Sequence, residues 1–496
     1  MKKSIKLLSL IMAIIISCAA ITSCAVAPQE ETTAPKAEQV ESDDNAVTGE
    51  ESESESEYVP EITSKNHNSD FYLSIMPDVN PVDYYWVKES ENNALSDAIY
   101  VRQENVRKYL GVNIIGTATG NTDKYITPFK TAIKNKDDSV HMLVSHVFFG
   151  IEGFITENYL TDINEIPQIN TEAPYWNQQF MEDLSIKGHY FLGFSDFNIL
   201  YTNVVVFNKS ILDLYKDTIE EDFYQLVTDY KWTLDKMIGI AKLVSADALS
   251  DGKTEDDMFG ITGFLNVPVA PFIQACNMSI VEMDDKGAYK IAVYNEKNKQ
   301  KMSTLVDKLS DLIASDSAWI KKNSPSCSKV FSESRTLMYL CSTYNLPAIL
   351  QYGIDFGVLP YPMYDEAQKD VGYRSLQWGG YICIPSYLSN PDMVGETIEM
   401  LSYYSKDVNI AFYEKLLGKQ VADSPKDRAM LDIVWDSVCS DFGQTYGSAM
   451  NTTVDFLFML CNICEEGSTS NLASYMAKGE SAANKGLKGF IAKVKN

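Results

Sequence analysis

The chain of 496 residues has few of the side chains and motifs that enzymes commonly use for catalysis. It holds only four histidines, which are His67, His141, His146 and His189. No HExxH, GxSxG, Walker A or GxGxxG pattern is present. We therefore expect a protein that is not an enzyme and that holds no cofactor or metal. Because Asp and Glu are plentiful, a glycosidase-like carboxylate pair is the enzymatic alternative that stays open.

Long apolar runs are missing except at the start of the chain. Three lysines precede an apolar run over residues 7–16, which is too short to span a bilayer and indicates a secretory signal peptide over 1–23. The following Ile21-Thr22-Ser23-Cys24 resembles the lipobox of bacterial lipoproteins. That resemblance implies acylation of Cys24, with palmitate or similar chains, and attachment to the extracytoplasmic face of the cell membrane. No other run is long enough to span.

Basic and bulky aliphatic residues are scarce between Cys24 and Asn68. Residues 25–68 contain twelve acidic residues and two lysines, which leaves −10 of the formal net charge of −26. Such a segment cannot bury enough apolar surface to fold, so 24–68 is predicted to be a disordered, acidic tether behind the lipidated cysteine. The acidic balance argues against nucleic acid and against an anionic ligand. A local basic site at Arg102 or Arg374 could still attract an anionic ligand in spite of the negative net charge.

The nine cysteines show no disulfide framework. Seven follow Cys24, so at least one of them is unpaired; they are Cys276, Cys327, Cys341, Cys383, Cys439, Cys461 and Cys464. The last two form a CxxC pattern that can serve redox chemistry or metal binding. Here the pattern lies in an apolar helical run with no second pair, which favours buried thiols.

The first part of the body alternates strand and helix patterns. Strand-like runs at 71–76, 112–115 and 142–144 are separated by a helix that Ser96 begins and Gly111 ends, and by a helix near 126–133. This order predicts parallel strands with helices on the sheet faces.

The second part opens with 202–207, a continuous apolar run typical of a strand that is buried on both faces. Thr233 then fits a helix N-cap, and the apolar residues of 302–313 recur at helical spacing. A strand at 380–384, a helix at about 392–402 and a mostly helical C-terminus follow.

The order of these pieces resembles the extracellular solute-binding proteins of ABC importers, family 1, which includes maltose-binding protein. Four stretches carry the resemblance: Val205-Val206-Phe207-Asn208-Lys209, Lys231-Trp232-Thr233, residues 331–340, and Phe356-Gly357-Val358-Leu359-Pro360-Tyr361-Pro362. Two departures stand out. The segment from Phe331 to Arg335 lacks the usual glycine, and the C-terminal helices match no family motif.

The resemblance implies an α/β fold of the periplasmic-binding-protein-like type II class. It has two lobes, each a mainly parallel sheet flanked by helices, with a hinge between them and a ligand cleft. We expect lobe 1 to comprise 69–199 and 375–412, and lobe 2 to comprise 200–374 and 413–496. The implied function is capture of a mono- or oligosaccharide and its delivery to an ABC permease, by a protein that we expect to be a monomer.

Candidate ligand contacts lie in loops that follow the expected strands, where flat aromatic faces and polar groups could hold a sugar. Tyr84, Ser145, Phe148 and Asn198 belong to these loops. The residues that we select are Asp83, Tyr85, Trp86, His146, Asp196, Phe197, Tyr344, Asn345, Trp378 and Tyr381. Each could instead be a core or loop residue, since aromatics are interior residues first. Trp232 fits a structural role better, because a helix that begins there needs an aromatic anchor.

Two other classes of function remain open. A surface-anchored hydrolase acting on glycans would need only a carboxylate pair, and release of reducing ends from a glycan would reveal it. A non-transport adhesin would suit the tether equally well. The two-lobed pattern favours a binding protein over an adhesin, because hinged lobes close on a ligand.

Overall fold

The computed structural model describes residues 58–495, except for 64, 77–80, 119–121, 146–149, 247–251, 265–270, 285, 322–324, 423, 451–461 and 463–469. The predicted signal peptide, the lipidation site and most of the tether lie outside this range, as do His146, Phe148, Cys461 and Cys464. No helix in the described part of the chain is long and apolar enough to cross a membrane.

Lobe 1 is built on a four-stranded sheet in the order β13-β3-β1-β2. Its strands are β1 (Ser69–Ile75), β2 (Val112–Ala118), β3 (Met142–Val144) and β13 (Ile382–Cys383). Strand β1 lies parallel to both β2 and β3, whereas β13 pairs antiparallel with β3. The short β13 comes from far along the chain, so this sheet is assembled from two separate segments.

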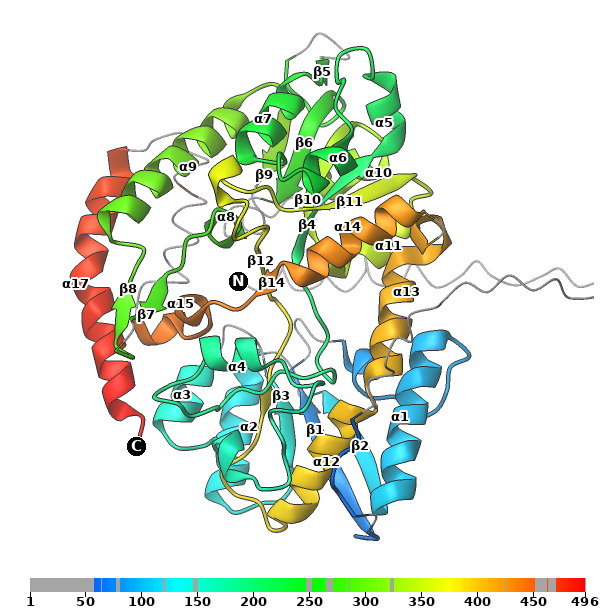
Figure 1. Ribbon diagram of the computed structural model, residues 1–496, viewed down its shortest axis with the longest axis vertical. Helices are drawn as coiled ribbons and strands as arrows, with labels where there is room; N and C mark the ends of the chain where they lie inside the picture. The colour runs from blue at the N-terminus through cyan, green and yellow to red at the C-terminus, as the bar shows by residue number, and fades with distance from the viewer. Residues whose placement is uncertain are drawn as a thin grey trace, which may run out of the picture. The chain divides into compact units, whose positions relative to one another are not determined.

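Helices and short turns connect and cover this sheet (Figure 1). They are η1 (Val82–Tyr84), α1 (Ala94–Leu110), α2 (Thr122–Lys134), α3 (Ile151–Thr156), η2 (Ile163–Glu165), α4 (Gln178–Asp183) and α12 (Pro391–Tyr403). The N-cap of α1 is Asn93, whose side chain accepts from the Ser96 amide. The helix therefore starts before the expected Ser96, because Asn93 offers the better-placed acceptor. It ends at Gly111 as predicted, with φ of 63°.

Lobe 2 contains a mixed six-stranded sheet in the order β11-β4-β10-β6-β5, with β9 also paired to β6. The strands are β4 (Asn203–Asn208), β5 (Ser245–Ala246), β6 (Met258–Phe264), β9 (Ala318–Lys321), β10 (Thr336–Ser342) and β11 (Phe356–Pro360). Strand β6 is parallel to β9 and β10, but β4 runs antiparallel to β10 and β11. Parallel pairing is thus confined to the middle of this sheet.

Helices surround the second sheet in turn. They are α5 (Lys209–Leu214), α6 (Phe223–Thr228), α7 (Leu234–Lys242), α8 (Pro271–Ala275), α9 (Glu296–Ala314), α10 (Ser326–Ser332), α11 (Leu346–Leu350) and α14 (Pro425–Asp436), with the turns η3 (Thr343–Asn345) and η4 (Glu366–Gln368). Thr233 caps α7 through the Lys236 amide, as its sequence predicts. Trp232 is fully buried and donates from Nε1 to the Pro360 carbonyl (2.9 Å), which fits its structural role.

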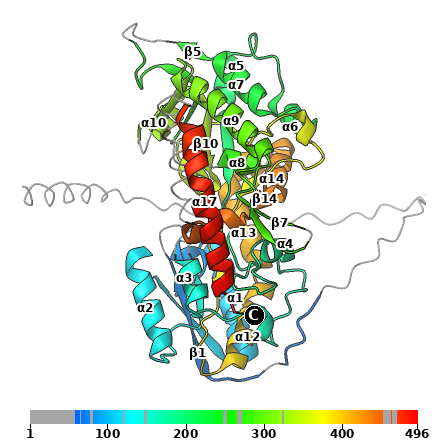
Figure 2. The same cartoon turned by 90° about the vertical axis from the view of Figure 1, so that its left-hand side faces the viewer.

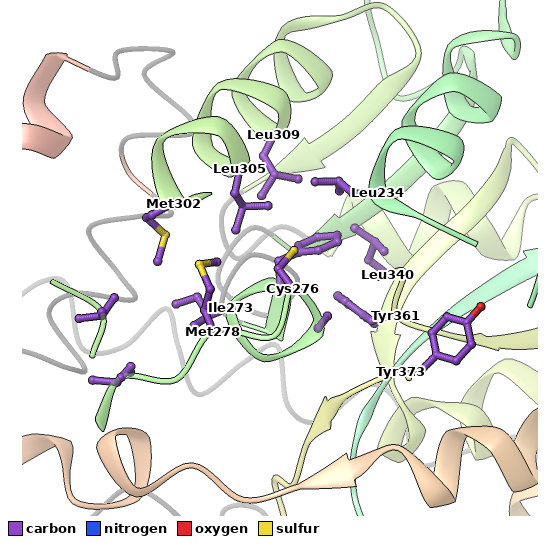
Figure 3. Close-up of a cluster of buried hydrophobic side chains, with 14 of the residues drawn as sticks. Leu234, Ile273, Cys276, Met278, Met302, Leu305, Leu309, Leu340, Tyr361 and Tyr373 are labelled. Carbon is purple, nitrogen blue, oxygen red and sulfur yellow. The ribbon is translucent and has the colours of Figure 1, made fainter. Parts of the chain in front are cut away.

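The apolar face of α9 supplies much of the core of lobe 2 (Figure 3). Met302, Leu305 and Leu309 point from α9 toward Cys276 and Leu340. All five side chains are at most 3% exposed. Burial of this many apolar groups provides the main driving force for folding of this lobe.

Three neighbouring chain segments form the hinge between the lobes. Two hydrogen bonds join the first segment, around Tyr201, to the second, around Gln377 and Trp378. The Trp378 amide donates to the Tyr201 carbonyl (2.7 Å), and the Tyr201 amide donates to Gln377 Oε1 (3.1 Å). The second segment also contains β12 (Ser375–Leu376), which pairs in parallel with β14 (Val438–Cys439) of the third segment. The chain therefore crosses between the lobes more than once, as the resemblance implies.

The remaining elements lie beside the hinge. Helix α13 (Lys406–Ala422) contacts α1 of lobe 1 and α11 of lobe 2, so it spans both lobes. The other elements are β7 (Val281–Met283), β8 (Tyr289–Ile291), α15 (Phe442–Thr445), η5 (Gly447–Met450) and α17 (Ser470–Lys493). The segment 375–412 that we expected in lobe 1 contains β12 and the first part of α13, and the structure places both elements at the junction of the lobes.

Residues 58–63 and 65–68 lie against lobe 1, although the sequence predicts them as the end of the tether. The Ile62 carbonyl accepts a hydrogen bond from a tyrosine hydroxyl of α1 (2.6 Å). Lys65 and His67 both contact the buried Glu396 carboxylate, the latter through Nε2 at 2.7 Å. These partners satisfy a carboxylate that would otherwise be buried unpaired, which explains why the segment is held in place.

The five described cysteines after Cys24 are all buried and free: Cys276, Cys327, Cys341, Cys383 and Cys439. Burial raises the pKa of Cys276 and Cys383 to about 12. Since the thiolate is the reactive form, we expect these thiols to be unreactive in the folded protein. In a variant with Cys24, Cys461 and Cys464 replaced by Ser, a thiol reagent should label them only after a denaturant is added. Rapid labelling of any one in native buffer would contradict this.

Candidate ligand-binding site

Four aromatic rings meet where the two lobes join, and we call them the aromatic cluster. Tyr84 comes from η1 of lobe 1, Tyr201 from the hinge, Tyr344 from η3 of lobe 2, and Phe412 from α13. Edge-to-face contacts connect them: Tyr84 to Phe412 at 5.3 Å, Tyr201 to Tyr344 at 5.7 Å, and Tyr201 to Phe412 at 6.0 Å between ring centroids. The cluster thus draws on both lobes and on the segments that connect them.

The edge of this cluster is open to solvent. Tyr344 is 52% exposed, which is unusual for so large an aromatic residue. Tyr84 and Trp378 are half-buried, while Tyr201 is buried beneath them. An exposed aromatic surface with hydroxyl groups around it can stack on the C–H face of a sugar and hydrogen-bond its hydroxyls.

Two buried polar atoms near the cluster lack hydrogen-bond partners among the described residues. The Asn203 side-chain oxygen accepts from Trp378 Nε1, but its Nδ2 atom is unpaired. The Tyr201 hydroxyl is also buried and unpaired. Unpaired buried donors are costly, so water or a ligand hydroxyl is the natural partner for each. Nearby, the exposed Asp83 carboxylate can accept hydrogen bonds from the same ligand.

Burial raises the pKa of the Tyr201 hydroxyl well above its ordinary value. Neighbouring Tyr85, Tyr84, Tyr344 and Asp83 act in the same direction. The Tyr201 hydroxyl therefore stays protonated and remains a hydrogen-bond donor across the physiological pH range.

Several predicted contacts occupy structural positions instead. Tyr85, Phe197 and Tyr381 are at most 1% exposed. Tyr85 packs against Phe197 at 5.5 Å, and the Arg102 guanidinium lies 4.6 Å from the centre of the Phe197 ring. In the described conformation these rings are part of the packed interior of lobe 1 and of the segments that lead to the hinge. Arg102 is too buried to attract an anion from solvent.

Trp86 and Asn345 also have local partners. Trp86 donates from Nε1 to the Ile114 carbonyl (2.8 Å) and covers Gly116, where a Cβ atom would lie within 3 Å of the indole. Asn345 accepts from the Ser342 amide (3.1 Å) as part of a capping box for η3. By capping η3, Asn345 holds the neighbouring Tyr344 in place.

Asp196 lines a separate pocket of about 470 Å³ in lobe 1. Its other walls include Trp176, Asn177, Asn198 and Asn409. Burial raises the pKa of Asp196 to about 6, while Lys406 acts in the opposite direction. The structure therefore does not place Asp196 among the four rings of the aromatic cluster.

A third feature is a pocket of about 370 Å³ beside the hinge. Glu182 of α4, Tyr289 of the β7–β8 hairpin, Arg374 and Asp441 are among its walls. Burial raises the pKa of Asp441 to about 6 in spite of backbone hydrogen bonds and the nearby Arg374. Arg374 is half-buried here, so it is the basic residue of the two we considered that a solute could reach.

Sequence reasoning selected Asp83, Tyr344 and Trp378 but missed Tyr201, Asn203 and Phe412. Tyr201 and Asn203 flank the start of the recognised β4, so their place at a lobe crossing was a usable signal. Phe412 carries no such signal, because only the packing of α13 between the lobes brings it to Tyr84 and Tyr201.

Comparisons with known proteins give matches in structure alone. No protein-family model matches the chain. No curated protein sequence matches it significantly. Among solved structures, the chain is similar to the GacH receptor of Streptomyces glaucescens, studied unliganded and with acarbose, at 14% identity and a TM-score of 0.52, covering 86% of this chain and 99% of the other.

Two further structures are similar to the same degree. An ABC substrate-binding protein from Listeria monocytogenes in complex with cycloalternan has 13% identity and a TM-score of 0.53, covering 85% of this chain and 99% of the other. The maltose/maltodextrin-binding domain of Bdellovibrio bacteriovorus bound to maltotriose has 12% identity and a TM-score of 0.54, covering 84% and 100%. The chain thus has the two-lobed type II fold of maltose-binding-protein-like substrate-binding proteins, which confirms the predicted fold class.

Proposed function

We propose that the chain is the substrate-binding lipoprotein of an ABC importer, and that it captures a saccharide between its lobes. The aromatic cluster is the observation that carries this proposal. It presents the exposed Tyr344 at the junction of two hinged lobes, and the half-buried Trp378 lies beside it. A ligand that touches residues of both lobes gains contacts only when the lobes approach, which is how binding proteins couple binding to closure.

The chemistry of the cluster favours a neutral, hydroxyl-rich ligand. Aromatic faces provide apolar contact, and Asp83, Asn203 and Tyr201 offer acceptors and donors for hydroxyl groups. The net charge of −26 disfavours an anion at long range. The similar solved structures include complexes with maltotriose and cycloalternan, which supports the same ligand class by fold analogy.

We further propose that Cys24 carries the lipid and that the permease receives the ligand at the extracytoplasmic face. Mass spectrometry of the protein from its native membrane should find an acylated N-terminal Cys24. A Cys24→Ser variant should lose the modification and appear in the soluble fraction. Membrane retention of that variant would contradict lipid anchoring.

Thermal melting of the purified chain against a panel of sugars, amino acids and peptides tests the proposed ligand class. A ligand that binds only the folded state adds about 2.7 kcal/mol of stability at one hundred times its dissociation constant. We expect a rise in midpoint with one group of saccharides and with no amino acid or peptide. A rise with peptides alone would overturn the saccharide assignment, and release of reducing ends would favour the hydrolase.

A further inference from the structure

The β7–β8 hairpin, the α15–η5 segment and α17 together join the two lobes beside the hinge, and we call them the C-terminal bridge. Helix α17 runs alongside both lobes in the two perpendicular views (Figures 1 and 2). The solute-binding family resemblance gives no counterpart for these C-terminal helices.

On lobe 1 the C-terminal bridge holds the short segment 183–187, which begins at the last residue of α4. Tyr289 is the central contact: its hydroxyl donates to the Ser185 carbonyl (3.0 Å) and accepts from the Lys187 amide (3.0 Å). The Lys187 ammonium donates to the Val494 carbonyl just beyond α17 (2.8 Å). Two distant parts of the chain, the β7–β8 hairpin and the end that follows α17, thus hold residues 185–187.

Two further hydrogen bonds tighten this contact. The buried Tyr446 hydroxyl of the α15–η5 region donates to the Leu184 carbonyl (2.8 Å). Ser440, at the end of the hinge segment, donates to Asp183 Oδ2 (3.2 Å). Asp183, Leu184, Ser185 and Lys187 therefore all form hydrogen bonds to the C-terminal bridge, to Val494 just beyond it, or to the hinge, and Ile186 between them is fully buried.

On lobe 2 the C-terminal bridge is attached through α8 and α9. Gln444 donates from Nε2 to Gln274 Oε1 of α8 (2.8 Å), and both side chains are at most 2% exposed. Lys299 of α9 pairs with Glu480 of α17 at 3.6 Å. The bridge also shares one continuous hydrophobic cluster with residues of both lobes, among them Phe180 of lobe 1.

We infer that the C-terminal bridge limits how far the two lobes can separate in the ligand-free protein. Lobe rotation of the usual kind needs neighbouring surfaces that can slide or part. Here hydrogen bonds and buried apolar contacts fasten segment 183–187 on lobe 1 to the elements on lobe 2, beside the hinge strands. The bridge therefore favours a small opening motion. This inference builds on the proposed closure of the lobes, but it concerns the protein without ligand.

A triple variant tests the restraint without any ligand. Lys187→Ala, Tyr289→Phe and Tyr446→Phe together remove the side-chain hydrogen bonds that link residues 184–187 to the C-terminal bridge. They keep both aromatic rings and leave the Ser440–Asp183 bond of the hinge in place. The matched control is Lys216→Ala, Tyr230→Phe and Tyr352→Phe, whose side chains are exposed. Spin labels at Val101→Cys on α1 and Leu214→Cys on α5 report the lobe separation, since both positions are over half exposed. Cys24, Cys461 and Cys464 are replaced by Ser in all proteins.

We expect the distance distribution of the triple variant to broaden and lengthen by several ångströms, whereas the control matches the parent protein. Hydrogen exchange of 199–203 and 375–378 should rise about tenfold or more in the triple variant. If the triple variant unfolds, Tyr289→Phe alone should give the same changes with smaller amplitude. Unchanged distances in every folded variant, with faster exchange confined to 183–187, would overturn the restraint. These outcomes do not depend on the identity of the ligand, so a failed saccharide panel leaves the test intact.

Discussion

Replacing Tyr344 with alanine should lower saccharide affinity by about tenfold or more, which corresponds to ~1.4 kcal/mol or more of binding free energy. Tyr344 is the most exposed member of the aromatic cluster and lies at the lobe junction, so its ring is available to a ligand. Its contact with Tyr201 is an edge-to-face contact on the surface of the cluster. Truncation should therefore leave the melting temperature of the ligand-free protein nearly unchanged.

The matched control is Tyr352→Ala. Tyr352 is an exposed tyrosine of lobe 2 that follows α11 and is outside the aromatic cluster. Calorimetric titration of both variants with the saccharide that stabilises the parent protein separates the two positions. Equal affinity of Tyr344→Ala and Tyr352→Ala would remove Tyr344 from the binding site.

The free energy of unfolding should increase as the pH falls toward about 5, and Asp441 should be a main cause. Burial raises the Asp441 pKa from 3.8 to about 6 in the folded protein. In the pH window between these two values, the folded state holds a proton that the unfolded state has lost. Stability is therefore greatest at the acidic end of this window and falls as pH rises through the folded pKa. The difference between the unfolded and folded pKa values of Asp441 corresponds to ~3 kcal/mol of free energy of unfolding.

Asp196 acts in the same direction, because burial also raises its pKa to about 6. Asp441→Asn separates the two contributions. The Gln444 amide donates to Asp441 Oδ1 (2.8 Å) and the Ile280 amide to Asp441 Oδ2 (3.3 Å), so the single amide oxygen introduced by the substitution can keep the shorter of these two bonds. Denaturant unfolding at several pH values should show that the free energy of unfolding depends clearly less on pH in Asp441→Asn than in the parent protein. If the free energy of unfolding changed with pH by the same amount in both proteins, Asp441 would not be the group that titrates.

Much of the fold could be predicted because its signals are local. The apolar run of β4, the Thr233 cap of α7 and the Gly111 end of α1 depend on a few adjacent residues, and all three are confirmed. The mixed pairing of the second sheet could not be predicted in the same way. Strand β4 is apolar on both faces whichever direction its neighbours run, so its sequence does not distinguish parallel from antiparallel partners.

The site was harder to predict, because aromatic residues serve both cores and binding surfaces. Tyr85 and Tyr344 follow expected strands and Phe197 lies just before an expected crossing between the lobes, yet only Tyr344 is exposed. What separates them is the tertiary packing around each ring. Phe412 joins the cluster only because α13 lies between the lobes, and Tyr289 reaches segment 183–187 only because the hairpin folds onto lobe 1.

A crystal structure of the protein with the saccharide that most raises its melting midpoint is the most direct test of the proposed binding site. We predict that the sugar lies between the lobes, with a ring face against Tyr344 or Trp378 and hydroxyl groups near Tyr201, Asn203 or Asp83. A saccharide bound on the outer surface of one lobe, or held only in the pocket beside Asp196, would contradict binding at the aromatic cluster.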